Sequence, residues 1–65
     1  MITYNVTKYL SSKKTYYEGV CLSGDTKPTK QTTNNKLANG SKLLEMDTST
    51  LYIYDEKNDT WRAWG

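Results

Sequence analysis

Carboxylates are the side chains in this sequence whose number and spacing come nearest to a catalytic arrangement. Five of them lie in the last third of the chain, at Glu45, Asp47, Asp55, Glu56 and Asp59. Glu45 and Asp47 share one face if their segment is a strand, as a carboxylate pair for glycoside hydrolysis would require. A chain of 65 residues, however, offers no substrate cleft of the usual volume. We therefore predict no catalytic residues and no enzymatic activity.

The remaining candidates for chemistry are one acidic turn and one thiol. Residues 55–59 lack the glycine and the closing glutamate of a calcium-binding loop. The chain has no histidine and a single cysteine, which excludes a metal site built on His or on paired Cys. Without a histidine to activate it, Cys21 is predicted to pack as a small apolar residue. We predict no metal site and no cofactor.

The length and charge of the chain indicate that it works in contact with other molecules. A chain this short buries only ~60% of the surface that its unfolded form exposes, and one cysteine allows no intrachain disulfide. Oligomerisation or docking onto a partner is the remaining source of stability. Residues 1–42 carry seven lysines and two carboxylates, whereas residues 43–65 carry two basic and five acidic side chains. Such complementary halves favour contacts between copies or with a larger assembly.

Two classes of partner are not expected. The lysines are dispersed, and the one arginine, Arg62, lies in the acidic half, which argues against nucleic acid as a partner. No run of about 18 apolar residues is present, which predicts no membrane span. The N-terminal residues also lack the basic region and apolar run of a signal peptide.

Alternation of apolar and polar residues predicts an all-β fold. Residues 2–9 alternate with period two, and residues 15–22 are a second β-prone run, in which Gly19 indicates a bulge or bend. After the turn signal Asn39-Gly40, three short segments (42–47, 51–55 and 60–64) read as a small antiparallel meander. No segment keeps a 3.6-residue apolar stripe, so little helix is expected. The chain is predicted to be a single domain, with N-terminal strands at 1–22, an extended polar loop at 23–39 and the meander at 40–65.

The polar loop is predicted to be an extended arm. Residues 23–39 contain only two aliphatic side chains, Leu37 and Ala38, and are rich in Thr, Asn and Lys. A structureless loop of this length is unusual inside a small domain. We expect it to lie along a neighbouring chain through Lys27, Lys30 and Lys36 and to become ordered on assembly. The alternative is a plain flexible connector.

Both faces of the predicted meander carry large side chains. One face has Leu44, Met46, Leu51, Ile53 and Trp61, and the other has Leu43, Tyr52, Tyr54 and Trp64. A small open sheet usually buries one face and exposes the other to water, so the second face must be covered by the N-terminal strands or by another molecule. We predict that Tyr52, Tyr54 and Trp64 form an outward aromatic contact. The alternative is a two-sheet sandwich that uses both faces internally.

One pattern in the sequence resembles a known family. Gly24-Asp25-Thr26-Lys27-Pro28 is followed by Asn39-Gly40-Ser41, Glu45-Met46-Asp47-Thr48, Leu51-Tyr52-Ile53-Tyr54-Asp55 and Trp61. This series is similar to a pattern, G-D-T-K-P, a spacer, G-S-x-x-x-E-x-D-T-x-x-x-Y-x-Y-D and a tryptophan, in small virion proteins and tail or fibre modules of tailed bacteriophages of Gram-positive hosts. The resemblance covers residues 24–61 and carries no enzymatic role. It implies a non-enzymatic, β-rich particle component that is repeated around a symmetric structure.

These observations predict a structural protein of a tailed-phage particle, associated with the capsid or decorating the head. It would be located in the virion after assembly in the cytoplasm of the bacterial host, and would contact other virion structural proteins as a homo-oligomer. The N-terminal strand and the arm would add to neighbouring subunits. The alternatives are a tail, baseplate or fibre component, a carbohydrate-binding adsorption module that uses the Tyr and Trp face, and a small regulator acting inside the host.

Overall fold

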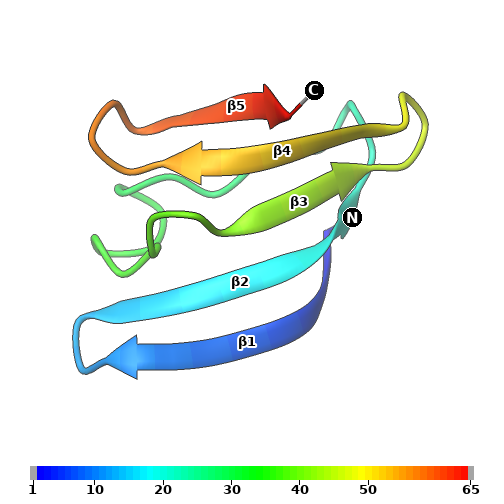
Figure 1. Cartoon of the computed structure of the whole chain (residues 1–65). Helices are drawn as coiled ribbons and strands as arrows, with labels where there is room; N and C mark the ends of the chain where they lie inside the picture. Colours follow the sequence, from blue (N-terminus) through cyan, green and yellow to red (C-terminus); the bar gives the residue numbers. More distant parts are fainter. Residues whose placement is uncertain (1, 65) are drawn as a thin grey trace.

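The structure, a computed structural model, describes residues 2–64 and folds them into one five-stranded sheet (Figure 1). The strands are β1 Thr3–Ser11, β2 Lys14–Cys21, β3 Lys42–Glu45, β4 Thr50–Asp55 and β5 Thr60–Trp64. Their order in the sheet is their order in the chain. β2 and β3 are parallel, and the other three pairs are antiparallel. The predicted all-β class and C-terminal meander are confirmed, and residues 2–64 contain no helix.

The parallel β2–β3 pair requires the long loop. Parallel neighbours need a crossover connection, which is usually a helix. Here residues 22–41 make the crossover without one, and Figure 1 shows them passing behind the sheet. Leu37 and Ala38 are buried, and Ala38 N donates a hydrogen bond to Thr15 O at 2.9 Å. The prediction of an arm that leaves the domain is therefore wrong, because the loop uses its two aliphatic side chains to cover its own sheet.

The pairing register decides which side chains share a face of the sheet. Tyr54 pairs with Trp61, and Leu51 pairs with Trp64. Paired residues on neighbouring strands point to the same face, and successive residues alternate. Trp61 therefore lies with Tyr54 on the face under the loop, here called the covered face. Trp64 lies with Leu51 on the opposite, open face, so the predicted assignment of the two tryptophans is wrong.

The core lies between the covered face and the crossover loop. Its buried apolar side chains are Cys21, Leu37, Ala38, Leu43 and Tyr54. The ring of Tyr54 packs against Trp61 with 5.2 Å between centroids, and its hydroxyl donates a hydrogen bond to Asp59 Oδ1 at 2.7 Å. The prediction that Tyr54 points outward is wrong, because this phenol has both its apolar packing and its polar partner inside the chain. Cys21 packs in the core as expected.

The second turn of the meander falls where the sequence predicts it, whereas the first begins two residues earlier, because β3 ends at Glu45. Residues 46–49 join β3 to β4, and residues 56–59 join β4 to β5. Each turn ends in a residue with left-handed backbone, Ser49 with φ 54° and Asp59 with φ 49°. Gly40, in the Asn39-Gly40 turn before β3, has φ 86°, which glycine adopts without steric cost.

β1 is an edge strand that lies outside the core. All nine of its residues are exposed, and a ring contact between Tyr4 and Tyr17, 5.0 Å between centroids, adds to its pairing with β2. The register shifts between Tyr4 and Val6 and again between Tyr9 and Ser11. The N-terminal strands thus extend the sheet instead of covering its second face, and the two-sheet sandwich is not formed.

Gly19 allows the start of β1 to approach β2 closely. A Cβ atom at this position would collide with the Thr3 carbonyl oxygen and lie 2.9 Å from Tyr4 Cα. We expect Gly19→Ala to displace the start of β1 and to lower the free energy of unfolding by about 1–3 kcal/mol, measured by urea denaturation.

Gly24→Ala is the matched control for this substitution. A Cβ atom at Gly24 would have no neighbour within 4 Å, so its unfolding midpoint should stay close to that of the unsubstituted chain. Equal stabilities of the two variants would show that β1 does not depend on the close approach at Gly19.

Candidate functional site

An ion pair joins the crossover loop to the covered face. Lys27 Nζ lies 2.7 Å from Glu45 Oε2, and the two side chains are only 16% and 7% exposed. The ammonium group also lies over the ring of Tyr52, 4.3 Å from its centroid. Thr48 Oγ1 donates a hydrogen bond to Glu45 Oε1 at 2.7 Å. Both oxygens of Glu45 therefore have a partner, as a buried carboxylate requires.

The electrostatics of this pair favour a structural role. Hydrogen bonds from Lys27 and Thr48 lower the pKa of Glu45. Burial by itself would lower the pKa of Lys27, but the hydrogen bond and the charge of Glu45 outweigh it, and the pKa is raised. Efficient general acid–base groups have a pKa near the working pH, and these shifts move both groups away from neutrality.

Two more contacts fasten the same part of the loop. Trp61 Nε1 donates a hydrogen bond to Pro28 O at 2.8 Å. Asp47 accepts hydrogen bonds from Ser23 N at 2.9 Å and from Ser23 Oγ at 2.5 Å. We call Lys27, Pro28, Glu45, Tyr52 and Trp61 the loop anchor. Every one of them belongs to the sequence pattern singled out over residues 24–61, so in this chain that pattern describes how the loop is held on the sheet.

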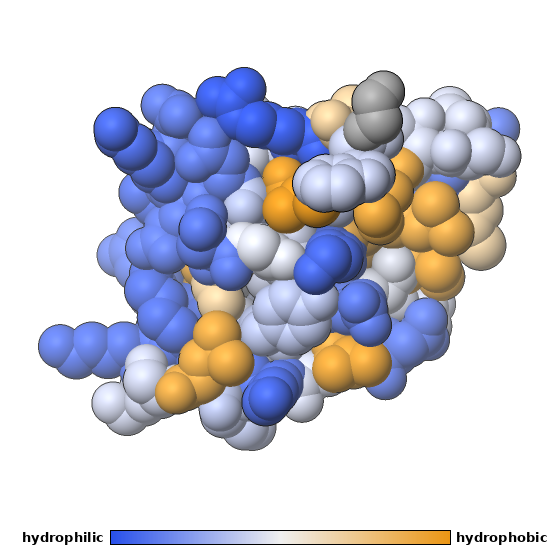
Figure 2. All heavy atoms as spheres, viewed as in Figure 1, coloured by the Kyte–Doolittle hydropathy of each residue, from blue (hydrophilic) through white to orange (hydrophobic). Residues whose placement is uncertain are grey.

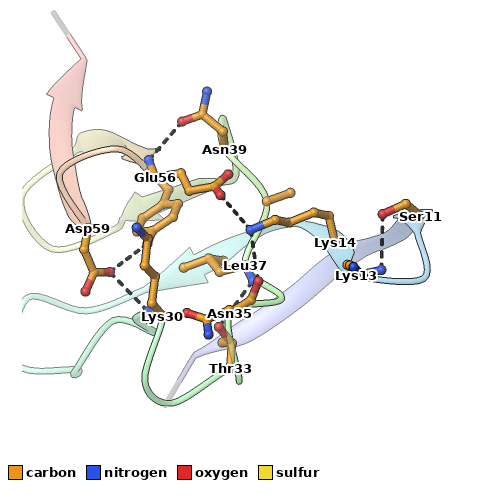
Figure 3. Close-up of polar contacts among 12 residues, drawn as sticks. Ser11, Lys13, Lys14, Lys30, Thr33, Asn35, Leu37, Asn39, Glu56 and Asp59 are labelled. Carbon is orange, nitrogen blue, oxygen red and sulfur yellow. Dashed lines mark hydrogen bonds and ion pairs between the residues drawn. The ribbon is translucent and has the colours of Figure 1, made fainter.

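A second group of polar contacts holds the middle of the loop (Figure 3). Lys14 Nζ donates to Glu56 Oε2 at 2.6 Å and to Asn35 O at 3.0 Å. Lys30 N donates to Asp59 Oδ1 at 3.1 Å. These bonds connect the loop to the start of β2 and to the turn between β4 and β5, which lie at the same end of the sheet. The contact between Ser23 and Asp47 holds the loop at the opposite end.

The three lysines predicted as an arm do not form a common site. Lys27 is engaged in the loop anchor. Lys30 is half-buried, and Lys36 is exposed and accepts a hydrogen bond from Thr15 N through its carbonyl oxygen. The spacing of the three lysines in the sequence does not predict these different environments. Each environment depends on the strand that lies beneath the residue.

The predicted aromatic contact is also not formed. Tyr54 is buried, Tyr52 is half-buried beneath Lys27, and Trp64 is 67% exposed on the opposite face. The carbohydrate-binding alternative needed these three rings on one surface. The structure separates them, so they provide no shared platform for stacking on a sugar.

The open face carries an apolar row that crosses four strands. Val20 pairs with Leu44, Leu44 with Leu51, and Leu51 with Trp64. Leu44 is 38% exposed, although it lies near the middle of the sheet. Figure 2 shows apolar side chains gathered over β3 and β4 on the face that is turned to the viewer. The sequence predicted that Leu44 and Leu51 share a face, but it assigned Trp64 to the other face.

A charged row lies beside the apolar row. Glu18 pairs with Lys42, Lys42 with Ile53, and Ile53 with Arg62. Arg62 Nε lies 2.7 Å from Asp55 Oδ2. Hydrogen bonds from Asn58 and Arg62 lower the pKa of Asp55 to about 2. The open face thus combines an apolar strip with side chains of both charge signs.

Neither a metal-binding cluster nor a membrane-spanning helix is found among the described residues. Within residues 2–64 no group of three or more His, Cys, Asp or Glu side chains is arranged to hold a metal ion. The same part of the chain contains no helix that is long and apolar enough to cross a membrane. The two uncovered surfaces, the open face and the outer edge of β1, are therefore the candidate functional sites.

The loop anchor makes stability depend on pH. Because the pKa of Glu45 is lowered in the folded chain, its contribution is complete above the ordinary value of 4.5 and is lost as the pH falls through the lowered value. We expect Glu45→Gln to lower the urea midpoint at pH 7. The difference from the unsubstituted chain should shrink as the pH falls toward about 2. An equal difference at both pH values would contradict this role of the Glu45 charge.

Comparison with known proteins identifies no family for this chain. No protein-family model, no curated protein and no solved structure matches the chain. The fold and the two uncovered surfaces are therefore the observations from which a function can be proposed.

Proposed function

We propose that this chain is a non-enzymatic structural component of a tailed-phage particle, associated with the capsid or decorating the head, and that it acts by protein–protein contacts. The observation that carries the proposal is β1, an edge strand exposed at all nine positions. Among the described strands it pairs with β2 alone. Its outer edge therefore presents backbone N–H and C=O groups to which a strand of another subunit can add.

The composition of β1 suits strand addition. Residues 3–11 contain β-branched and aromatic side chains, no proline and a single charge, Lys8. Natural edge strands that avoid pairing usually carry several charges or a proline. The two register shifts limit the regular part of β1 to the residues from Val6 to Tyr9. A partner strand would pair over this stretch, beside Tyr9, which is 81% exposed.

The opposite edge is less suited to the same contact. β5 has only five residues, and its central residue, Arg62, is held by Asp55. Trp61 of the same strand is engaged with the loop through Pro28. A short edge with a central charge is typical of strands that resist further pairing. We therefore assign the contact to β1.

The assignment to a phage particle is supported by the sequence pattern over residues 24–61. In this chain the residues of that pattern include the loop anchor and the buried Tyr54. The pattern thus supports a fold that this chain shares with the phage proteins it resembles. The proposed contact surface, β1, lies outside the pattern. A tail, baseplate or fibre component would use the same kind of strand contact. Locating the chain within the particle distinguishes this alternative from a head position.

The proposal is tested with purified particles of the phage that encodes the chain. We expect the chain in stoichiometric amount by mass spectrometry. Tyr9→Lys should reduce its incorporation by about tenfold, the effect of losing ~1.4 kcal/mol of contact free energy. Its melting temperature should not change, because the Tyr9 side chain is 81% exposed.

The matched control is Gln31→Lys, which adds the same charge to an exposed position of the crossover loop. It should be incorporated like the unsubstituted chain. Absence of the chain from the particles would refute the proposed function, and equal incorporation of both variants would refute the role of β1.

A further inference from the structure

The open face leaves apolar surface uncovered in the middle of the sheet. The apolar row, Val20, Leu44, Leu51 and Trp64, crosses four strands, and the crossover loop covers only the opposite face. The solvent-facing side of an antiparallel sheet normally carries polar residues, and small monomers rarely expose large contiguous apolar patches. A second sheet packed on this apolar row would complete a β-sandwich, and the described residues supply none.

We propose that the missing second sheet is the open face of another copy of this chain. The two copies would pack face to face around a two-fold axis that runs parallel to the strands, between β3 and β4. Sheets that pack in this way keep their strands within about 30° of each other. The interface would use the open face and not the outer edge of β1, so this inference does not depend on the proposed strand contact.

The axis brings the two apolar rows into contact. A two-fold rotation about this axis exchanges β3 with β4 and β2 with β5. Because Val20, Leu44, Leu51 and Trp64 lie in one cross-strand row, Leu44 of one copy falls opposite Leu51 of the other. Val20 falls opposite Trp64 in the same way, so the most exposed apolar ring of the face meets a small β-branched side chain.

The same rotation matches opposite charges. In the neighbouring row, Glu18 on β2 falls opposite Arg62 on β5 of the second copy, and the symmetry repeats this pair on the other side of the interface. Lys42 falls opposite Ile53, and its ammonium group already has the hydroxyl of Tyr16 as a partner at 3.1 Å. Charge complementarity therefore favours this arrangement.

The other face-to-face arrangement lacks this complementarity. A two-fold axis running across the strands would stack each strand on its own copy. Along the charged row it would place Glu18 against Glu18 and Arg62 against Arg62, and like charges across an interface are unfavourable. Along the apolar row it would place Glu18 against Leu22 and Lys42 against Met46, which would bury charges without partners.

The size of the chain also favours a second copy. A standard interface buries ~800 Å² on each partner, roughly a fifth of the 4404 Å² accessible surface of this chain. One sheet face is the only uncovered surface of the described residues that combines a row of apolar side chains with a polar border. Covering it would supply the burial that a chain of 65 residues cannot supply alone.

The inference is tested by sedimentation equilibrium over about 1–300 µM, a range that brackets a micromolar dissociation constant. We expect a species of twice the 7.5 kDa chain mass. Leu44→Lys should weaken association by at least about tenfold, because it places a charge at the centre of the apolar row. Gln31→Lys, on the crossover loop and away from both uncovered surfaces, is the matched control and should leave association unchanged. Circular dichroism establishes that both variants are folded.

Two charge reversals test how the two copies are oriented, and they provide a second test of the interface if Leu44→Lys fails to fold. Glu18→Arg and Arg62→Glu should each weaken association, and the double variant should recover it, because each position faces the other across the axis. Asp55→Asn removes the charge that pairs with Arg62 within the chain and should have little effect on association.

Three results would overturn the inference. The first is an unsubstituted chain that remains monomeric at the highest concentration. The second is association that Tyr9→Lys abolishes and Leu44→Lys leaves intact, which would indicate pairing through the β1 edge. The third is a double charge variant that associates no better than either single variant.

Discussion

The attachment of the crossover loop to the sheet is the interaction on which the rest of this structure depends. A parallel strand pair needs a long connection, and in this chain no helix provides it. The loop has only Leu37 and Ala38 to bury, so polar contacts at its ends must hold it in place. Lys27 bonds to Glu45 beneath the loop, and Trp61 bonds to the carbonyl oxygen of Pro28. The core forms because these contacts keep the loop over the covered face.

The same use of polar groups engages the carboxylates of the described residues. Each carboxylate of the described residues already accepts at least one hydrogen bond within the chain. The bonds to Glu45, Asp55 and Asp59 connect strands or hold the loop, and they lower the pKa of these groups. Acidic residues that seemed to be candidates for a reaction are instead part of the structure. The surfaces of the described residues that stay uncovered are the outer edge of β1 and the open face.

The two uncovered surfaces arise from one limitation of the fold. A single loop can cover only one side of a five-stranded sheet, and here it covers the side formed by β2 to β5. β1 therefore stays exposed at every position, and the opposite face keeps Leu44 and Trp64 in contact with solvent. The strand edge offers backbone hydrogen bonds, whereas the open face offers apolar area with balanced charge. The two surfaces therefore differ in the kind of contact that they can make.

The sequence by itself determined the local features of this protein. Alternation with period two and the turn residues at 39–40, 46–49 and 56–59 depend on neighbours in the chain, so the strands and the meander could be predicted from them. The tertiary structure alone decided the parallel pairing of β2 with β3, the position of the loop and the face to which each tryptophan points. Trp61 and Trp64 are three residues apart and must point to opposite faces, but nothing local says which one joins Tyr54. A shift of one residue in the β4–β5 register would exchange them, and that register is set by packing between strands and loop. For the same reason, the sequence shows that Tyr52 and Tyr54 share a face, whereas only the fold shows that this face lies under the loop.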